Sequence, residues 1–139
     1  MDRALIDTDI LSEIMRGRNG RVLENARTYV SEHSRFTLSA ITVAEIVKGL
    51  RKASRTQAID RFVAELPHFE VLPVDTDVAV LAGAMYAELE RTGQPIGRAD
   101  PLIAATASAH GLTLVTGNVA HYSRIPELGF PLDIANWRD

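Results

Sequence analysis

The chain has 139 residues, of which 46% are hydrophobic, and it contains no cysteine. This length predicts a single domain over residues 1–139, and the lack of cysteine excludes disulfide frameworks, zinc–thiolate sites and thiol nucleophiles. The formal net charge of −3 argues against a protein that coats nucleic acid, and no apolar run is long enough for a signal peptide or a membrane span, so we expect a cytoplasmic protein without a membrane partner.

Short apolar runs typical of strands alternate along the chain with segments of helical periodicity. The predicted strands lie at residues 4–6, 36–38, 69–74 and 112–115, with a weaker candidate at 132–135. The predicted helices lie at residues 20–33, 40–53, 54–66, 76–93 and 99–111, and the last two close with the glycine expected just past a helix end. This alternation predicts an α/β fold with a central, mostly parallel sheet and helices on both faces.

Two acids, Asp7 and Asp9, directly follow the first predicted strand. Ligands of such sheets bind beyond the carboxyl ends of the strands, and the segment LTLVTGN brings Thr116 and Asn118 to the same edge. An acid at the inner end of an apolar strand, such as Asp7, is costly to bury unless something pairs with it. We therefore expect polar groups from distant parts of the sequence to meet at this edge.

Two further acids, Glu45 and Asp100, are candidates for the same place, and each has a structural alternative. Thr42 and Glu45 have the spacing of a capping box, in which the carboxylate bonds to the backbone at the helix start. Asp100 precedes a proline, as a residue that caps a helix often does. Asp9 could likewise cap a helix that begins one residue later.

The segments LIDTDIL, TVAEIVKGL, GRADPLIAATA and LVTGN resemble, in order and spacing, the PIN-domain nucleases, and among them the VapC-type toxins of bacterial toxin–antitoxin pairs. The resemblance covers nearly the whole chain and implies a PIN-like three-layer fold. It also implies a type II toxin that hydrolyses RNA phosphodiester bonds as an endoribonuclease dependent on Mg²⁺ or Mn²⁺. The acids that match the family's catalytic, metal-binding positions are Asp7, Glu45 and Asp100, with Thr8, Thr116 and Asn118 as polar lining.

The chemistry of these residue types agrees with that implication. Magnesium prefers oxygen ligands and is commonly held by a few carboxylates plus the phosphate of the substrate. Such an ion activates water and offsets charge during in-line attack on phosphorus. Arg16 and Arg18 would guide the RNA backbone towards the acids, although a solvated helix face is the simpler interpretation of such a cluster.

The resemblance further implies partners. VapC-type toxins pair with a small antitoxin, whose disordered tail can place an arginine among the acids, and contact DNA only through that antitoxin. They usually form homodimers through their helices, and the apolar positions within residues 26–30 and 43–50 are compatible with this.

The chain departs from the family pattern at two positions. Asp9 stands where asparagine is usual, and a helix cap is the interpretation we favour. His121 stands where the family's fourth acid commonly lies, so it is either a partly exposed histidine in a helical turn or a group that hydrogen-bonds a metal-bound water.

Two alternatives to the nuclease remain open. The DTD motif after a strand also opens the signature of haloacid-dehalogenase phosphotransferases, but that signature has threonine where this chain has Leu11. The other alternative is an interaction module that keeps the fold and uses its acids as helix caps.

Overall fold

The structure, a computed structural model that describes residues 1–139, is organised around a five-stranded sheet in which every neighbouring pair is parallel. The strand order is β3-β2-β1-β4-β5. Each predicted strand is present, and the observed strands are β1 (Ala4–Ile6), β2 (Thr37–Ser39), β3 (Glu70–Leu72), β4 (Thr113–Val115) and β5 (Ile134–Ala135). The prediction of a parallel α/β sheet is therefore confirmed.

Helices connect the strands, and the five predicted helical segments are all present with closely similar bounds. They are α1 (Thr8–Arg16), α2 (Gly20–His33), α3 (Ala40–Lys52), α4 (Thr56–Glu65), α5 (Thr76–Arg91), α6 (Asp100–Ala109), α7 (Val119–Tyr122) and α8 (Arg124–Glu127), with a short 3₁₀ turn at Leu66–His68. Gly93 and Gly111 follow α5 and α6 with φ of 68° and 64°. Glycine adopts this left-handed conformation without strain, which explains why these helices stop there.

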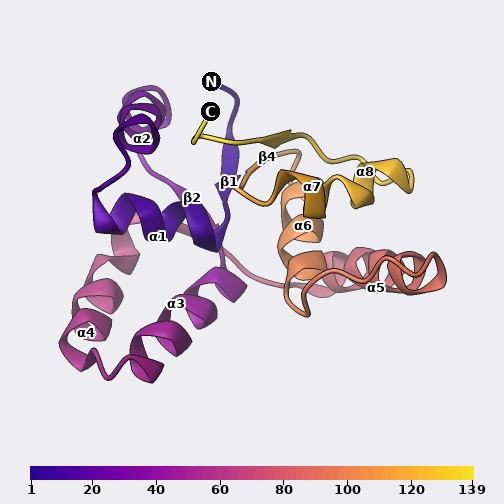
Figure 1. Ribbon diagram of the computed structural model, residues 1–139, viewed down its shortest axis with the longest axis horizontal. Coiled ribbons are helices and arrows are strands. Elements are labelled where there is room, and N and C mark those ends of the chain that lie inside the picture. The colour runs from indigo at the N-terminus through magenta and orange to yellow at the C-terminus, as the bar shows by residue number, and fades with distance from the viewer.

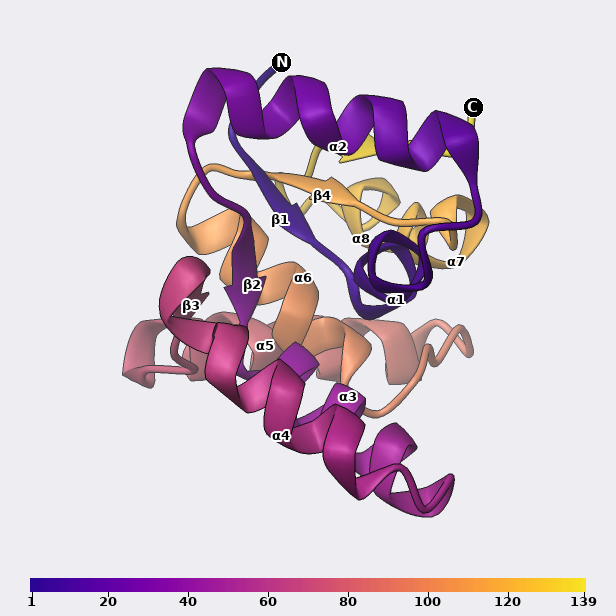
Figure 2. The same ribbon diagram turned by 90° about the vertical axis from the view of Figure 1, so that its left-hand side faces the viewer.

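The helices form layers on both faces of the sheet, as Figures 1 and 2 show. Successive strand residues point to opposite faces. Leu5 and Leu114 therefore pack with α5, α6, α7 and α8 in one core cluster. Ala4, Ile6 and Val115 pack with α1, α2, α3 and α4 in the other. The result is the three-layer arrangement that the sequence predicts.

The strand order reverses in the middle of the sheet: β2 and β3 lie on one side of β1, and β4 and β5 lie on the other. Strand β1 lies between β2 and β4, with Ile6 in register with Val115. The backbone N–H of Asp7 extends this pairing by donating to the Val115 carbonyl oxygen at 2.8 Å. Ligand sites of open parallel sheets lie at the carboxyl edge of such a switch point.

No helix combines the length and apolar character that a membrane crossing requires.

Candidate active site

Asp7 lies at the carboxyl end of β1, and its residue is only 5% exposed. It is the N-cap of α1, and its Oδ1 accepts a hydrogen bond from the Thr8 N–H at 2.8 Å. Thr116, the residue after β4, donates its hydroxyl to Asp7 Oδ2 at 2.8 Å. No ion pair of the structure involves Asp7. The sequence thus places a buried carboxylate at this edge without a basic partner.

The environment of Asp7 disfavours its charged form. Burial, reinforced by the nearby charges of Asp9 and Asp100, raises the pKa of Asp7 to about 7, although the hydrogen bonds from Thr116 and Thr8 oppose the shift. A shift of this size marks a group that would gain from a neighbouring positive charge. The predicted meeting of Asp7 with Thr116 is confirmed. Asn118 is exposed, and it contributes its backbone N–H, which donates to the Thr116 hydroxyl at 3.0 Å.

Asp100 faces the same place from the start of α6, and two residues of α7 contact its carboxylate oxygens. The Tyr122 hydroxyl donates to Asp100 Oδ1 at 3.1 Å, and His121 Nε2 lies 2.9 Å from Asp100 Oδ2. A Cβ at Gly97 would lie 2.8 Å from Asp100 Oδ2, so a larger residue there would force the Asp100 carboxylate to shift. The capping interpretation of Asp100 is wrong, because Ala99 is the N-cap residue and the carboxylate of Asp100 bonds to side chains of another element.

The Tyr122 hydroxyl also lies 3.5 Å from Asp7 Oδ1, so it stands between the two carboxylates. Tyr122 is fully buried. Burial and the charges of Asp7, Asp100 and Glu45 raise the pKa of Tyr122 far above its ordinary value. The hydroxyl therefore remains a hydrogen-bond donor at any physiological pH.

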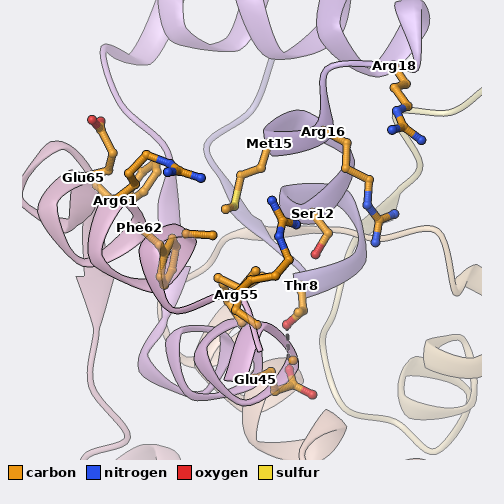
Figure 3. Close-up of a pocket in the computed structure, with 15 residues that line it drawn as sticks. Thr8, Ser12, Met15, Arg16, Arg18, Glu45, Arg55, Arg61, Phe62 and Glu65 are labelled. Carbon is orange, nitrogen blue, oxygen red and sulfur yellow. Dashed lines mark hydrogen bonds between the residues drawn. The ribbon is translucent and has the colours of Figure 1, made fainter. Parts of the chain in front are cut away.

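Glu45 projects from the second turn of α3 towards α1. Its Oε1 accepts the Thr8 hydroxyl at 2.6 Å (Figure 3). The same hydroxyl lies 3.1 Å from the Thr42 hydroxyl. The predicted capping box is wrong, because α3 begins earlier and Ser39 caps it with a hydrogen bond from the Ile41 N–H at 3.0 Å. The carboxylate of Glu45 therefore does not cap α3, and it bonds to Thr8, the residue that follows Asp7.

Asp9 does not cap α1 as expected, because the helix already begins at Thr8 and Asp7 occupies the N-cap position. Instead, Asp9 lies in the first turn. Its Oδ1 accepts the Ile10 N–H at 2.8 Å, and its Oδ2 accepts the Gly117 N–H at 2.9 Å. Asp9 therefore ties α1 to the loop that follows β4.

The C-terminal segment reaches the same acids. Arg138 Nη2 lies 3.6 Å from Asp9 Oδ2, and its Nε donates to Glu13 Oε1 at 2.7 Å. A Cβ at Gly117 would lie 1.8 Å from Arg138 Nη1, so only glycine lets the guanidinium cross this loop. Trp137, 5% exposed, anchors the segment in the core. The negative charge of Asp9 is thus offset within the chain, whereas that of Asp7 is not.

The acids fit a hard divalent cation by chemistry, but they do not all converge. Asp7 and Asp100 meet at one hydroxyl, while Glu45 is held by Thr8. No three acidic or histidine side chains are arranged to hold one metal ion. Magnesium commonly takes only one or two carboxylates, keeping waters and substrate phosphate as its other ligands. The buried, unpaired Asp7 with Asp100 beside it meets that requirement.

A groove of about 590 Å³ lies between α1, α3 and α4 and includes Thr8 and Glu45 among its lining residues (Figure 3). Arg16 and Arg18 line it, as the RNA-guiding hypothesis requires. Two arginines that our hypothesis omitted, Arg55 and Arg61, line it as well. Apolar side chains also line the groove, among them Met15, Ile46, Leu50, Phe62 and Phe69. The groove can therefore take a negatively charged chain with apolar or aromatic groups.

Sequence reasoning missed two residues of the site. Tyr122 left a weak signal: it adjoins His121, and a buried tyrosine requires a partner for its hydroxyl. The sequence contains no signal for the role of Arg138, because no sequence pattern indicates that the end of the chain contacts Asp9.

Comparisons with known proteins agree with this geometry. The chain matches the PIN domain family over residues 4–128. It is 37% identical over 97 residues to the tRNA(fMet)-specific endonuclease VapC of Salmonella typhimurium, covering 67% of this chain and 71% of the relative. It is 31% identical over 137 residues to Ribonuclease VapC10 of Mycobacterium tuberculosis, covering 96% of both.

Solved structures show the same fold. The DNA-bound VapBC of Salmonella typhimurium superposes with a TM-score of 0.83 at 30% identity and covers 99% of both chains. VapBC2 of Rickettsia felis, bound to a DNA fragment from its promoter, has a TM-score of 0.82 at 27% identity and covers 96% of this chain and 98% of that one.

Proposed function

Because this chain belongs to the PIN domain family, we propose that it is an endoribonuclease that acts as the toxin of a type II toxin–antitoxin pair. One observation carries the proposal: Asp7, buried and without a basic partner, lies beside Asp100 at the carboxyl edge of the sheet. Relatives named as ribonucleases support the reaction class. The family match argues against the phosphotransferase alternative.

Asp7 and Asp100 are the proposed principal ligands of Mg²⁺ or Mn²⁺, with Glu45 as the third acid of the pocket. When bound, such an ion supplies Lewis-acid activation of water and offsets negative charge on the phosphoryl oxygens. The protein itself holds the carboxylates in place: Thr116 fixes one oxygen of Asp7, and Tyr122 fixes one of Asp100. Thr8 places Glu45 at the end of the arginine-lined groove.

The groove is the proposed path of the RNA. Arg16, Arg18, Arg55 and Arg61 offer guanidinium groups to the phosphates, which compensates locally for the net charge of −3. Glu45 and Glu65 are the two acids that line the groove, whereas Asp7 and Asp100 do not line it. Glu45, which Thr8 joins to the start of α1, is therefore the proposed link between the arginines and the other site acids.

A cognate antitoxin is the proposed protein partner, since the similar solved structures are named as complexes of VapB with VapC. Those complexes contain DNA, and we propose that this chain contacts DNA only through the antitoxin. A homodimer remains part of the proposal.

The test is cleavage of an end-labelled RNA by the purified protein. We expect cleavage with Mg²⁺ or Mn²⁺, none with a chelator, and none for Asp7→Asn. Asp75→Asn is the matched control: this exposed acid caps α5 by accepting the Val78 N–H at 2.9 Å, and asparagine caps equally well. A folded wild type without RNA cleavage would favour the interaction module, and hydrolysis of a phosphomonoester would favour the phosphotransferase.

A further inference from the structure

Two adjacent residues of α7 contact the two oxygens of Asp100. Tyr122 donates to Oδ1 at 3.1 Å, and His121 lies 2.9 Å from Oδ2. The Tyr122 hydroxyl is also within 3.5 Å of Asp7, an acid 115 residues away in the sequence. The loop that leads into α7 carries Thr116, which holds the other oxygen of Asp7. A single segment, residues 116–122, therefore contacts both acids.

We propose that Tyr122 is a positioning residue of the nuclease site, whose hydroxyl sets the spacing of the Asp7 and Asp100 carboxylates for a shared divalent cation. The inference rests on the proposed function. A carboxylate oxygen that accepts a hydrogen bond keeps a second lone pair, so Asp100 Oδ1 can bond to Tyr122 and to an ion together. Groups that orient metal ligands in this way raise metal affinity without touching the ion.

The geometry explains why the position suits tyrosine. The ring is fully buried in the core cluster that covers one face of the sheet, so it has no freedom to turn away. The hydroxyl is the only polar group of this side chain, and it contacts both Asp7 and Asp100. Without that hydroxyl, Asp100 Oδ1 would lose its donor, and the two carboxylates would face each other with no group between them.

A purely structural role is the competing explanation, since any buried tyrosine hydroxyl needs a partner. The chain contains a matched case. Tyr29 is 1% exposed, and its hydroxyl bonds to the backbone of Ala4, accepting from the N–H at 3.1 Å and donating to the carbonyl at 3.3 Å. Ala4 begins β1, at the end of the strand opposite Asp7. Removing either hydroxyl costs a buried hydrogen bond, but only Tyr122 contacts the acids.

The experiment compares Tyr122→Phe with Tyr29→Phe. Phenylalanine keeps the ring in the core, and circular dichroism checks the fold of both variants. Mn²⁺ binding is measured by isothermal titration calorimetry without RNA, together with kcat and KM for RNA cleavage. We expect Tyr122→Phe to bind Mn²⁺ about 10–100-fold more weakly, as is typical when a group that orients a ligand is lost. Its KM for RNA at saturating Mn²⁺ should stay at the wild-type value, and Tyr29→Phe should bind Mn²⁺ like the wild type.

The outcomes separate the two proposals. Wild-type Mn²⁺ affinity in Tyr122→Phe, with active wild-type enzyme, would overturn the role of Tyr122 and leave the nuclease standing. An equal loss of affinity in both variants would also overturn it, because the effect would then come from core packing. A wild type that neither binds Mn²⁺ nor cleaves RNA would overturn the proposed function itself.

Discussion

Replacing Asp7 by asparagine removes the only buried acid of the chain and should change how stability depends on pH. In the metal-free protein, burial and two neighbouring acids raise the pKa of Asp7 from 3.8 to about 7. Between these values the native protein holds a proton that the unfolded chain has released. The free energy of unfolding therefore falls as pH rises through this window, and the stabilisation by the neutral acid is lost above pH 7.

The magnitude follows from the size of the shift. Each pH unit between the two pKa values costs about 1.4 kcal/mol, so the whole window amounts to about 4 kcal/mol, of which roughly 3 kcal/mol falls between pH 5 and pH 8. Asp7→Asn cannot ionise at this position. Relative to the wild type, the variant should therefore gain about 3 kcal/mol between pH 5 and pH 8. The substitution also changes hydrogen bonds of residue 7. That change affects the free energy of unfolding equally at pH 5 and pH 8, so it cancels when the two pH values are compared.

Urea unfolding of both proteins at pH 5 and pH 8, with a chelator present, measures the effect. Asp75→Asn, the exposed cap variant, should show the wild-type dependence on pH. Adding Mn²⁺ at pH 8 should then stabilise the wild type and leave Asp7→Asn unchanged, because a ligand that binds only the native state raises its stability. Parallel pH dependence in the wild type and Asp7→Asn would refute the reasoning about Asp7.

Three further predictions concern the other site residues. Glu45→Gln and Asp100→Asn should each keep the fold by circular dichroism and reduce RNA cleavage by more than about 100-fold, the upper range for groups that only orient metal ligands; full activity of either variant would remove that acid from the site. The double variant Arg16→Ala/Arg18→Ala should lower the slope of log affinity against log salt by about 1.4, since each contact to single-stranded RNA contributes about 0.7; an unchanged slope would return both arginines to a solvated helix face. His121→Ala should reduce cleavage less than Asp7→Asn does, and His121→Asp should bind Mn²⁺ more tightly in a titration; an equal or weaker affinity would show that position 121 does not face the ion.

The fold could be predicted from local pattern because its elements depend on short-range signals. The α2 segment carries its apolar residues at helical spacing, and its observed bounds of Gly20–His33 agree with the prediction. Gly93 and Gly111 mark helix ends through their positive φ. Strand ends are predicted less accurately. The predicted strand at residues 36–38 includes Phe36, whereas β2 begins at Thr37, because an apolar residue beside a strand resembles one within it.

The capping interpretations failed for a reason that local sequence cannot reveal. Each cap motif competes with long-range partners for the same carboxylate. Glu45 accepts a hydrogen bond from Thr8, and Asp100 accepts one from Tyr122, and both donors belong to other elements. The position of Asp7 was predictable because it depends only on a strand ending at a switch point, whereas the partners of Glu45 and Asp100 depend on how α3, α6 and α7 pack.

Asp9 shows how the end of the chain completes the charge balance of the site. Asp9 and Glu13 lie one turn apart on α1, and Arg138 contacts both. This ion pair gives Asp9 a positive neighbour, whereas Asp7 and Glu45 have none. Asp9 still contributes to the raised pKa of Asp7. For the proposed cation, the acid of this edge that is buried and has no basic partner is therefore Asp7 rather than the arginine-paired acids along α1. Under the proposed function, Arg138 therefore neutralises the acids on α1 and leaves Asp7, which Tyr122 joins to Asp100, for the cation.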